Sequence, residues 1–168
     1  MSTSVSVNTY AYSVTYVTQQ MIKSLKDIVR MSGLSLEKIL DDWDSVELAL
    51  YTWLGSKHLQ KVALEVYNPS TNALVVRWDI DVNYGYSAGE DGSLWTDPDA
   101  IKHAIAKAGA VASTCRYEFK MTNAAGRPDV PGWGKAAYRS TDGFTQHCVG
   151  TTIGAGSLAS STSYWRKS

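Results

Sequence analysis

Alternation of apolar and polar residues is clearest between residues 61 and 86, and it predicts a β-hairpin there. The first arm covers residues 61–67 and the second covers residues 74–84, with a turn over 68–72. A period of two is typical of strands that bury one face, and a hairpin alone is marginal in water, so the apolar face needs a cover. Its apolar positions are Val62, Leu64, Val66, Leu74, Val76, Trp78, Ile80, Val82 and Tyr84.

Helical periodicity on both sides of this hairpin supplies candidates for the cover. The first helix is expected over residues 9–33, where apolar residues recur every three or four positions and a glycine is placed to end the helix. A second helical region spans residues 35–55, with a break near Asp42 and a new start at Asp44, because Asp-Ser-Val-Glu has the spacing of a capping box. A third helix is expected over residues 97–109, with proline in its first turn.

A third strand is predicted where residues 115–121 alternate again, after a polar loop at 87–96 and the third helix. Three helices and at least three strands define a two-layer α+β domain. Beyond this strand the chain is rich in glycine, serine and threonine, and a segment of this length without a helical pattern is either disordered or a lid. Its short strand-like runs are 136–139, 144–153 and 163–166.

Composition narrows the class of protein. The 168 residues suit one domain, and 16 basic against 16 acidic residues argue against general nucleic-acid binding and against an anionic membrane surface. The first ten residues are expected to be a flexible tail without the features of a signal peptide, so we predict a cytoplasmic protein. Cys115 and Cys148 are then interpreted as reduced thiols.

Candidate catalytic and metal-binding residues are few. His147 and Cys148 are adjacent and would lie on opposite faces of a strand, so they do not form a nucleophile and base with each other. A small cysteine- or histidine-dependent hydrolase nevertheless stays as the alternative. The His and Cys spacing matches no metal site, and the glycines at 150–156 lack the Lys-Ser/Thr of a phosphate loop, so neither a metal nor a cofactor is expected.

Several segments together resemble a known family. Residues 61–69 and 74–82 look like the central hairpin of HORMA domains, and the order of helices around it agrees. The resemblance covers essentially the whole chain and is strongest to the bacterial branch found in CBASS anti-phage operons. The segments similar to that branch are 13–18, 126–130, 132–133, 138–143 and 164–166.

The resemblance implies a single HORMA domain, with a tail at 1–10, a core at 11–122 and a C-terminal safety belt of short strands at 123–168. In that family a closure-motif peptide adds as a strand to the last core strand while the belt crosses over it. Here the receiving edge would be residues 113–122, and the terminal strand of the belt would pair with residues 73–84.

The resemblance also implies site residues. Those expected to bind the peptide are Arg116, Tyr117, Glu118, Phe119, Lys120, Met121, Tyr138 and Phe144. Those expected to dock the belt on the core are Val76, Trp78, Ile80, Tyr164 and Trp165.

The implied function is that of a non-enzymatic signalling adaptor. The implied partners are a closure-motif peptide from a phage protein or a second HORMA-like protein, a cGAS/DncV-like nucleotidyltransferase that the closed form binds and activates, and a AAA+ remodelling ATPase that acts on the N-terminus. Neither membrane binding nor direct nucleic-acid binding is expected.

Overall fold

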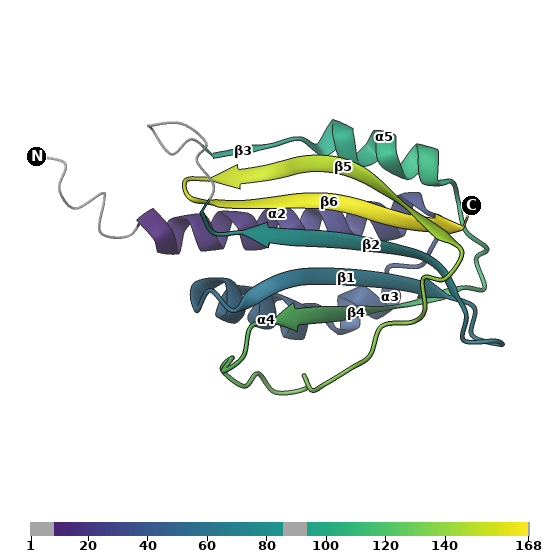
Figure 1. The fold of residues 1–168 in the computed structure, drawn as a ribbon, viewed down its shortest axis with the longest axis horizontal. Coiled ribbons are helices and arrows are strands. Elements are labelled where there is room, and N and C mark those ends of the chain that lie inside the picture. The colour runs from purple at the N-terminus through teal and green to yellow at the C-terminus, as the bar shows by residue number, and fades with distance from the viewer. Residues whose placement is uncertain (1–8, 86–93, 168) are drawn as a thin grey trace, which may run out of the picture.

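A six-stranded antiparallel sheet with helices against it forms the protein (Figure 1). This computed structural model describes residues 9–85 and 94–167, without the side chains of residues 9 and 39. The strand order β3-β5-β6-β2-β1-β4 places β3 and β4 at the two edges, and it confirms the expected α+β class. The elements are α2 (Thr9–Met31), α3 (Glu37–Asp41), α4 (Trp43–Gly55), β1 (Leu59–Tyr67), β2 (Leu74–Asn83), β3 (Leu94–Thr96), α5 (Pro98–Ala108), β4 (Arg116–Asn123), β5 (Phe144–Ala155) and β6 (Leu158–Lys167).

Helix α2 lies along the sheet, as its periodicity predicted, and ends next to Gly33, whose φ of 91° favours glycine. Its buried stripe packs in the core and includes Val17, Met21, Leu25 and Ile28. The helix contacts β5 and β6, and its Ser13 lies against Gly156 in the turn between those strands. Helix α2 therefore supports the hairpin formed by β5 and β6. The short tail strand considered at residues 5–7 falls outside the described residues.

The second helical region is divided at Asp42, but the predicted restart at Asp44 is wrong. Helix α4 begins at Trp43, and the Asp42 side chain makes no capping hydrogen bond. The backbone N–H of Asp42 still donates to the Lys38 carbonyl, so the chain keeps a helical turn across the break. Ser35 does act near the start, since its hydroxyl accepts from the N–H of Glu37.

The third helix is confirmed at α5. Asp97 accepts a hydrogen bond from the backbone N–H of Ala100, and Pro98 occupies the first turn. Ile101 and Ile105 are buried against the core. Among the described residues, no helix is long and apolar enough to cross a membrane.

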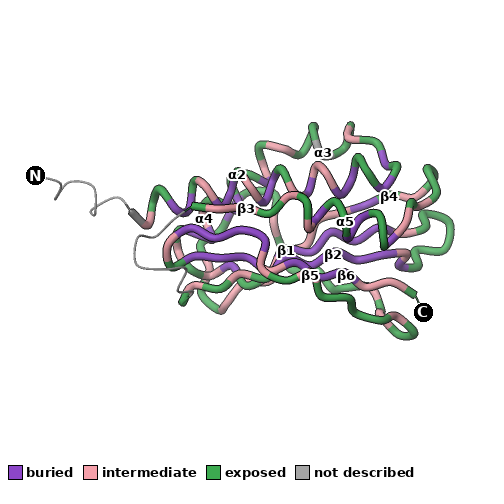
Figure 2. Tube along the Cα trace, turned by 90° about the horizontal axis from the view of Figure 1, so that it is seen from above, coloured by how far each residue is buried: buried purple, intermediate pink, exposed green. Residues whose placement is uncertain are grey.

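The central hairpin buries both of its faces, which the alternating pattern did not predict. Strands β1 and β2 pair in register with Leu64 opposite Trp78, and their apolar face lies in the core. On the polar face, Glu65 and Asp79 are 0% exposed and Arg77 is 8% exposed. Figure 2 shows these central strands as largely buried. Paired charges, described below, replace the water that the pattern led us to expect on this face.

The C-terminal strands are longer than the short runs expected from the sequence. β5 and β6 form a hairpin that spans 12 and 10 residues, whereas residues 136–139 form no strand. β6 pairs with β2 along its length, from Val76 opposite Arg166 to Asn83 opposite Ala159. The loop expected at 87–96 also contains the short β3, which pairs with β5.

Candidate functional site: a groove beside the edge strand

One edge of the sheet is formed by β4, which pairs with β1 alone. Residues 124–143, here called the crossing segment, leave the end of β4, run back beside that strand and then pass to β5 at the opposite side of the sheet (Figure 1). The crossing segment contains no helix or strand. The outer edge of β4 therefore faces a stretch of chain that does not pair with it.

A groove of about 510 Å³ separates β4 from the crossing segment. An adjoining hollow of about 340 Å³ extends it toward α3 and α4, past Asp42 and Ser45. The groove is lined by Trp53, by residues 119–123 of β4, and by 124–127, 133–136 and Tyr138 of the crossing segment.

Two tryptophans hold the first half of the crossing segment against α4. The rings of Trp53 and Trp133 meet edge to face with centroids 5.9 Å apart. Trp53 Nε1 donates to the Pro128 carbonyl at 2.7 Å, and Trp133 Nε1 donates to the Ser45 hydroxyl at 3.0 Å. Because each indole has its hydrogen-bond partner, the aromatic wall of the groove is formed before any ligand enters.

The second half of the crossing segment is held by an ion-pair cluster on the polar face of the sheet. Arg139 donates to Glu65 twice, from its backbone N–H at 2.9 Å and from Nη1 at 2.8 Å. Lys120 Nζ lies 2.7 Å from the same carboxylate, and both cations also pair with Glu118. We call Glu65, Glu118, Lys120 and Arg139 the Glu65 clamp.

Electrostatic pairing inside the clamp shifts the pKa values of two members. Burial alone would raise the pKa of Glu118, but the hydrogen bond and positive charge of Arg139, with Lys120, hold it below its usual value. Burial would likewise lower the pKa of Arg139, and its hydrogen bonds to Glu118 and Glu65 raise it instead. Both shifts favour the charged forms of Glu118 and Arg139, which their ion pair requires.

Aromatic contacts extend this cover across the sheet. The Arg139 guanidinium carbon lies 3.7 Å from the centroid of the Tyr67 ring, and that of Arg77 lies 4.9 Å from the centroid of Tyr138. Arg77 pairs with the buried Asp79, which also accepts from Trp165 Nε1 at 3.1 Å. The crossing segment and Trp165 of β6 thus cover the polar face together.

The residues expected to bind peptide fall into three groups. Phe119, Lys120, Met121 and Tyr138 line the groove, and Glu118 lines the adjoining hollow. Arg116 is exposed at the start of β4 and lines neither space, while Tyr117 is buried and donates to the Ser35 carbonyl. Phe144 begins β5, four strands away from β4 in the sheet.

The residues expected to dock the belt lie on the two strands that pair. Val76, Trp78 and Ile80 belong to β2, and Tyr164 and Trp165 belong to β6. Trp78 is directly opposite Tyr164, with ring centroids 4.8 Å apart.

Sequence reasoning missed Glu65, Arg127 and Arg139 as site residues. The alternation in residues 61–67 puts Glu65 on the face opposite the apolar one, although a carboxylate within the apolar run 62–66 is a signal of a buried ion pair. Both arginines lie in segments that carry the family resemblance, but their roles depend on where the crossing segment lies.

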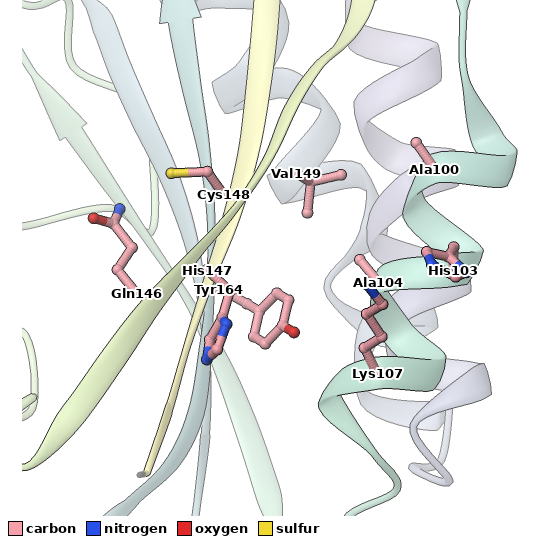
Figure 3. A pocket seen from close by; sticks show the side chains of 9 residues that line it. All are labelled: Ala100, His103, Ala104, Lys107, Gln146, His147, Cys148, Val149 and Tyr164. Carbon is pink, nitrogen blue, oxygen red and sulfur yellow. The ribbon is translucent and has the colours of Figure 1, made fainter.

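A second hollow, of about 470 Å³, lies between α5 and β5 and contains the residues considered for a hydrolase (Figure 3). The His147 ring stacks on Tyr164 with centroids 4.8 Å apart, and Cys148 points away from α5. Within the described residues, no hydrogen bond joins Cys148 to His147 or to His103. Both cysteines are free thiols. The described residues also contain no group of three or more side chains suited to hold a metal ion.

The fold and the groove define a domain in which a long C-terminal segment passes around an open sheet edge. The sequence profile of Bacterial HORMA domain 2 matches residues 2–168, and the chain belongs to that family. No curated protein sequence matches the chain.

Solved structures share the fold at low sequence identity. A chain of the mitotic checkpoint complex aligns with a TM-score of 0.71 at 12% identity, over 93% of this chain and 99% of that chain. C. elegans HTP-2 bound to the HIM-3 closure motif gives 0.59 at 13% identity, over 80% and 72%. A chain of the E. coli MS115-1 CdnC:HORMA-deltaN complex gives 0.61 at 13% identity, over 91% and 86%.

Proposed function

We propose that this protein is a cytoplasmic signalling adaptor that holds a closure-motif peptide between β4 and the crossing segment, and in that state binds and activates a cGAS/DncV-like nucleotidyltransferase in anti-phage defence. The observation that carries the proposal is the groove of about 510 Å³ along the unpaired edge of β4. The same proposal includes the division of the chain into a tail at 1–10, a core at 11–122 and a safety belt at 123–168.

Strand addition is the binding mode that this edge favours. An edge strand presents unpaired N–H and C=O groups, and a peptide strand can pair with them while its side chains enter neighbouring pockets. At β4 the eight residues extend over roughly 26 Å, at 3.3 Å per residue. Each backbone hydrogen bond contributes about 0.5–1.5 kcal/mol, so several together with the aromatic wall support stable binding.

The pairing of β6 with β2 supports the closed state in this proposal. The family resemblance implies that the terminal strand of the belt pairs with the second hairpin arm when a peptide is held, and β6 occupies that position. Tyr138 and Arg139 cross the sheet face at the same time, so a strand in the groove would be enclosed by the chain.

The proposed partners follow from the relatives. HTP-2 binds a closure motif, and the CdnC:HORMA complex joins a HORMA protein to CdnC, although identities of 13% leave the transfer of either partner to this chain a proposal. A AAA+ ATPase that opens the closed form from the N-terminus completes the scheme that the CBASS resemblance implies.

A reconstitution tests the proposal. A random peptide library, displayed with its C-terminus anchored, is first selected on the intact protein. The selected peptide is then added to the protein and to the nucleotidyltransferase from the same gene cluster, and cyclic oligonucleotide synthesis is measured. We expect synthesis only when protein, peptide and enzyme are combined.

A pair of matched variants links that result to the groove. Ala136 is exposed and lines the groove, so Ala136→Trp should obstruct it and abolish both peptide retention and enzyme activation. Ala106, exposed on α5 and outside the groove, gives the control Ala106→Trp, which should behave as the unaltered protein. Equal peptide retention by the two variants would rule out the groove as the binding site.

A further inference from the structure

Two of the three cations that line the groove have no ion-pair partner among the described residues. Its lining includes the cationic residues Lys120, Arg127 and Lys135 and no aspartate or glutamate. Lys120 is already paired with Glu65 and Glu118 in the clamp. Within the described part of the chain, neither Arg127 nor Lys135 forms an ion pair with a carboxylate, and the exposed Asp129 near Arg127 does not line the groove.

Arg127 is held in a fixed position beside β4. Its guanidinium carbon lies 4.4 Å from the centroid of the Trp53 ring, which Trp133 and the Pro128 carbonyl hold in place. Stacking on an aromatic face leaves the edge of a guanidinium group free to donate in its own plane. The stacked guanidinium of Arg127 therefore presents its N–H donors to a ligand in one fixed plane, whereas an exposed arginine on the surface can rotate.

One donor of this fixed group is buried without a partner. Arg127 Nη1 is shielded from solvent and makes no hydrogen bond to any described residue. The same is true of the acceptor Oδ1 of Asn123, the last residue of β4, in the lining of the same groove. Buried polar groups in proteins are almost always paired, so an unpaired donor and an unpaired acceptor in one groove indicate a place prepared for a polar ligand.

We infer that the peptide held in this groove carries an aspartate or glutamate whose side-chain carboxylate binds Arg127, at the Asn123 end of β4. The inference rests on the proposed function and specifies the class of peptide. A carboxylate matches a guanidinium fork and would satisfy the orphaned Nη1, while Asn123 Oδ1 accepts an N–H from the same peptide. At the other end, Asp42 and Glu118 line the hollow together with Lys38 and Lys135. Positive and negative charges balance there, so the Arg127 end is the more favourable place for an acidic residue.

Selection statistics provide the first test. The C-terminally anchored random library presents carboxylates only on side chains, so peptides retained by the intact protein should be enriched in aspartate or glutamate at one position. Retained peptides with no acidic position would overturn this inference and leave the proposed function in place. Retention of no peptide at all would overturn the proposed function and, with it, this inference.

A double-mutant cycle provides the second test. Replacing the acidic residue of a selected peptide with its amide should weaken binding to the intact protein by roughly 10- to 100-fold, the range for a lost hydrogen bond to a charged group. The same peptide change should have little effect on Arg127→Met and an intermediate effect on Arg127→Lys. The control Arg30→Met removes an exposed arginine of α2 that pairs with Asp27. In this variant the peptide change should weaken binding as much as it does in the intact protein. If the peptide change also weakened binding to Arg127→Met by roughly the full 10- to 100-fold, another group would bind the carboxylate.

Discussion

Glu65 lies in the middle of β1 with both carboxylate oxygens occupied, and the groups that occupy them come from different parts of the chain. Lys120 is its neighbour on β4, and Arg139 arrives from the crossing segment. A buried carboxylate that loses a partner keeps its desolvation cost without the compensating attraction. The position of the crossing segment is therefore coupled to the stability of the core.

The Arg139 contact predicts a measurable loss of stability. Arg139→Met should lower the free energy of unfolding by about 1–3 kcal/mol, because Glu65 keeps only Lys120 as a charged partner. Urea unfolding followed by tryptophan fluorescence measures this. Arg30→Met removes an exposed arginine and should cost less than about 1 kcal/mol. Equal losses in the two variants would show that the clamp adds nothing to stability.

The lowered pKa of Glu118 predicts how stability depends on pH. An unfolded chain has the ordinary pKa of 4.5 at this position, so it binds this proton more readily than the folded protein. The contribution of Glu118 is thus complete above that value and is lost as the pH falls through the lower folded pKa.

Urea unfolding over a series of pH values tests the sign of this effect. The stability gap between the unaltered protein and Glu118→Gln should shrink as the pH falls from about 6 to about 3. Glu47, an exposed glutamate of α4, gives the control Glu47→Gln, whose gap should change little. A constant gap for Glu118→Gln would contradict the assigned direction of the shift.

For single residues, the sequence predicted which apolar residues of the hairpin are buried but did not predict that its charged residues are buried too. An alternation of charge looks the same whether a strand faces water or faces paired charges. Glu65, Arg77 and Asp79 are buried because residues more than fifty positions later in the chain cover them. Such long-range partners leave no mark on local periodicity.

The helices and the central hairpin were predictable at the scale of elements, since each has long, strong periodicity and recognisable end residues. β6 was only partly predicted. Residues 159–163 of this strand are alanine, serine and threonine and show no apolar alternation, yet Ser160 and Thr162 are buried. Small residues suit a strand enclosed by β2 and β5, but the same composition in isolation is typical of a loop.

The pairing of β3 with β5 depends on close contact between Gly154 and Trp95. The two residues are directly opposite, and a Cβ added at Gly154 would lie 2.2 Å from Trp95 Nε1. Gly154→Ala should therefore displace the indole and release the three-residue β3, while the other five strands stay paired. Tryptophan fluorescence compared with a Trp95→Phe background measures this.

The control for that experiment is Gly55→Ala, where an added Cβ meets nothing within 4 Å. It should leave the fluorescence unchanged and raise the free energy of unfolding by up to about 1 kcal/mol, because alanine restricts the unfolded chain more than glycine does. An unaltered Trp95 signal in Gly154→Ala would show that the sheet accommodates the methyl group without losing β3.

At the scale of the whole molecule, the crossing segment closes a ring. Its two ends are fixed by β4 on one side of the sheet and by β5 and β6 on the other. A strand in the groove would pass through this ring. A short peptide with a free end can thread through it, but a ligand with a folded domain at each end can enter only if the ring opens.

A disulfide between β2 and β6 tests whether the ring opens there. Asp81 and Ser161 are direct partners, and opposed residues of antiparallel strands lie about 4.5–5.5 Å apart at Cα, within disulfide range. In a background without Cys115 and Cys148, the oxidised Asp81→Cys, Ser161→Cys protein should associate with a doubly capped ligand at least about tenfold more slowly than the reduced protein. A short peptide should bind both forms alike. If the capped ligand associated equally fast with the oxidised and reduced proteins, the ring would open at a place other than the β2–β6 pairing.

The contact between Ser13 of α2 and Gly156 has a consequence for the order in which the molecule comes apart. A force that unwinds the chain from its beginning breaks the hydrogen bond from the Tyr10 hydroxyl to the Leu54 carbonyl and then the Ser13 contact, both within the first two turns of α2. The hairpin of the final two strands would lose this part of its backing early, while the remaining turns of α2 still packed in the core. Disassembly would then begin at the N-terminal end of α2, and a protein opened in this way would be able to close again around another peptide.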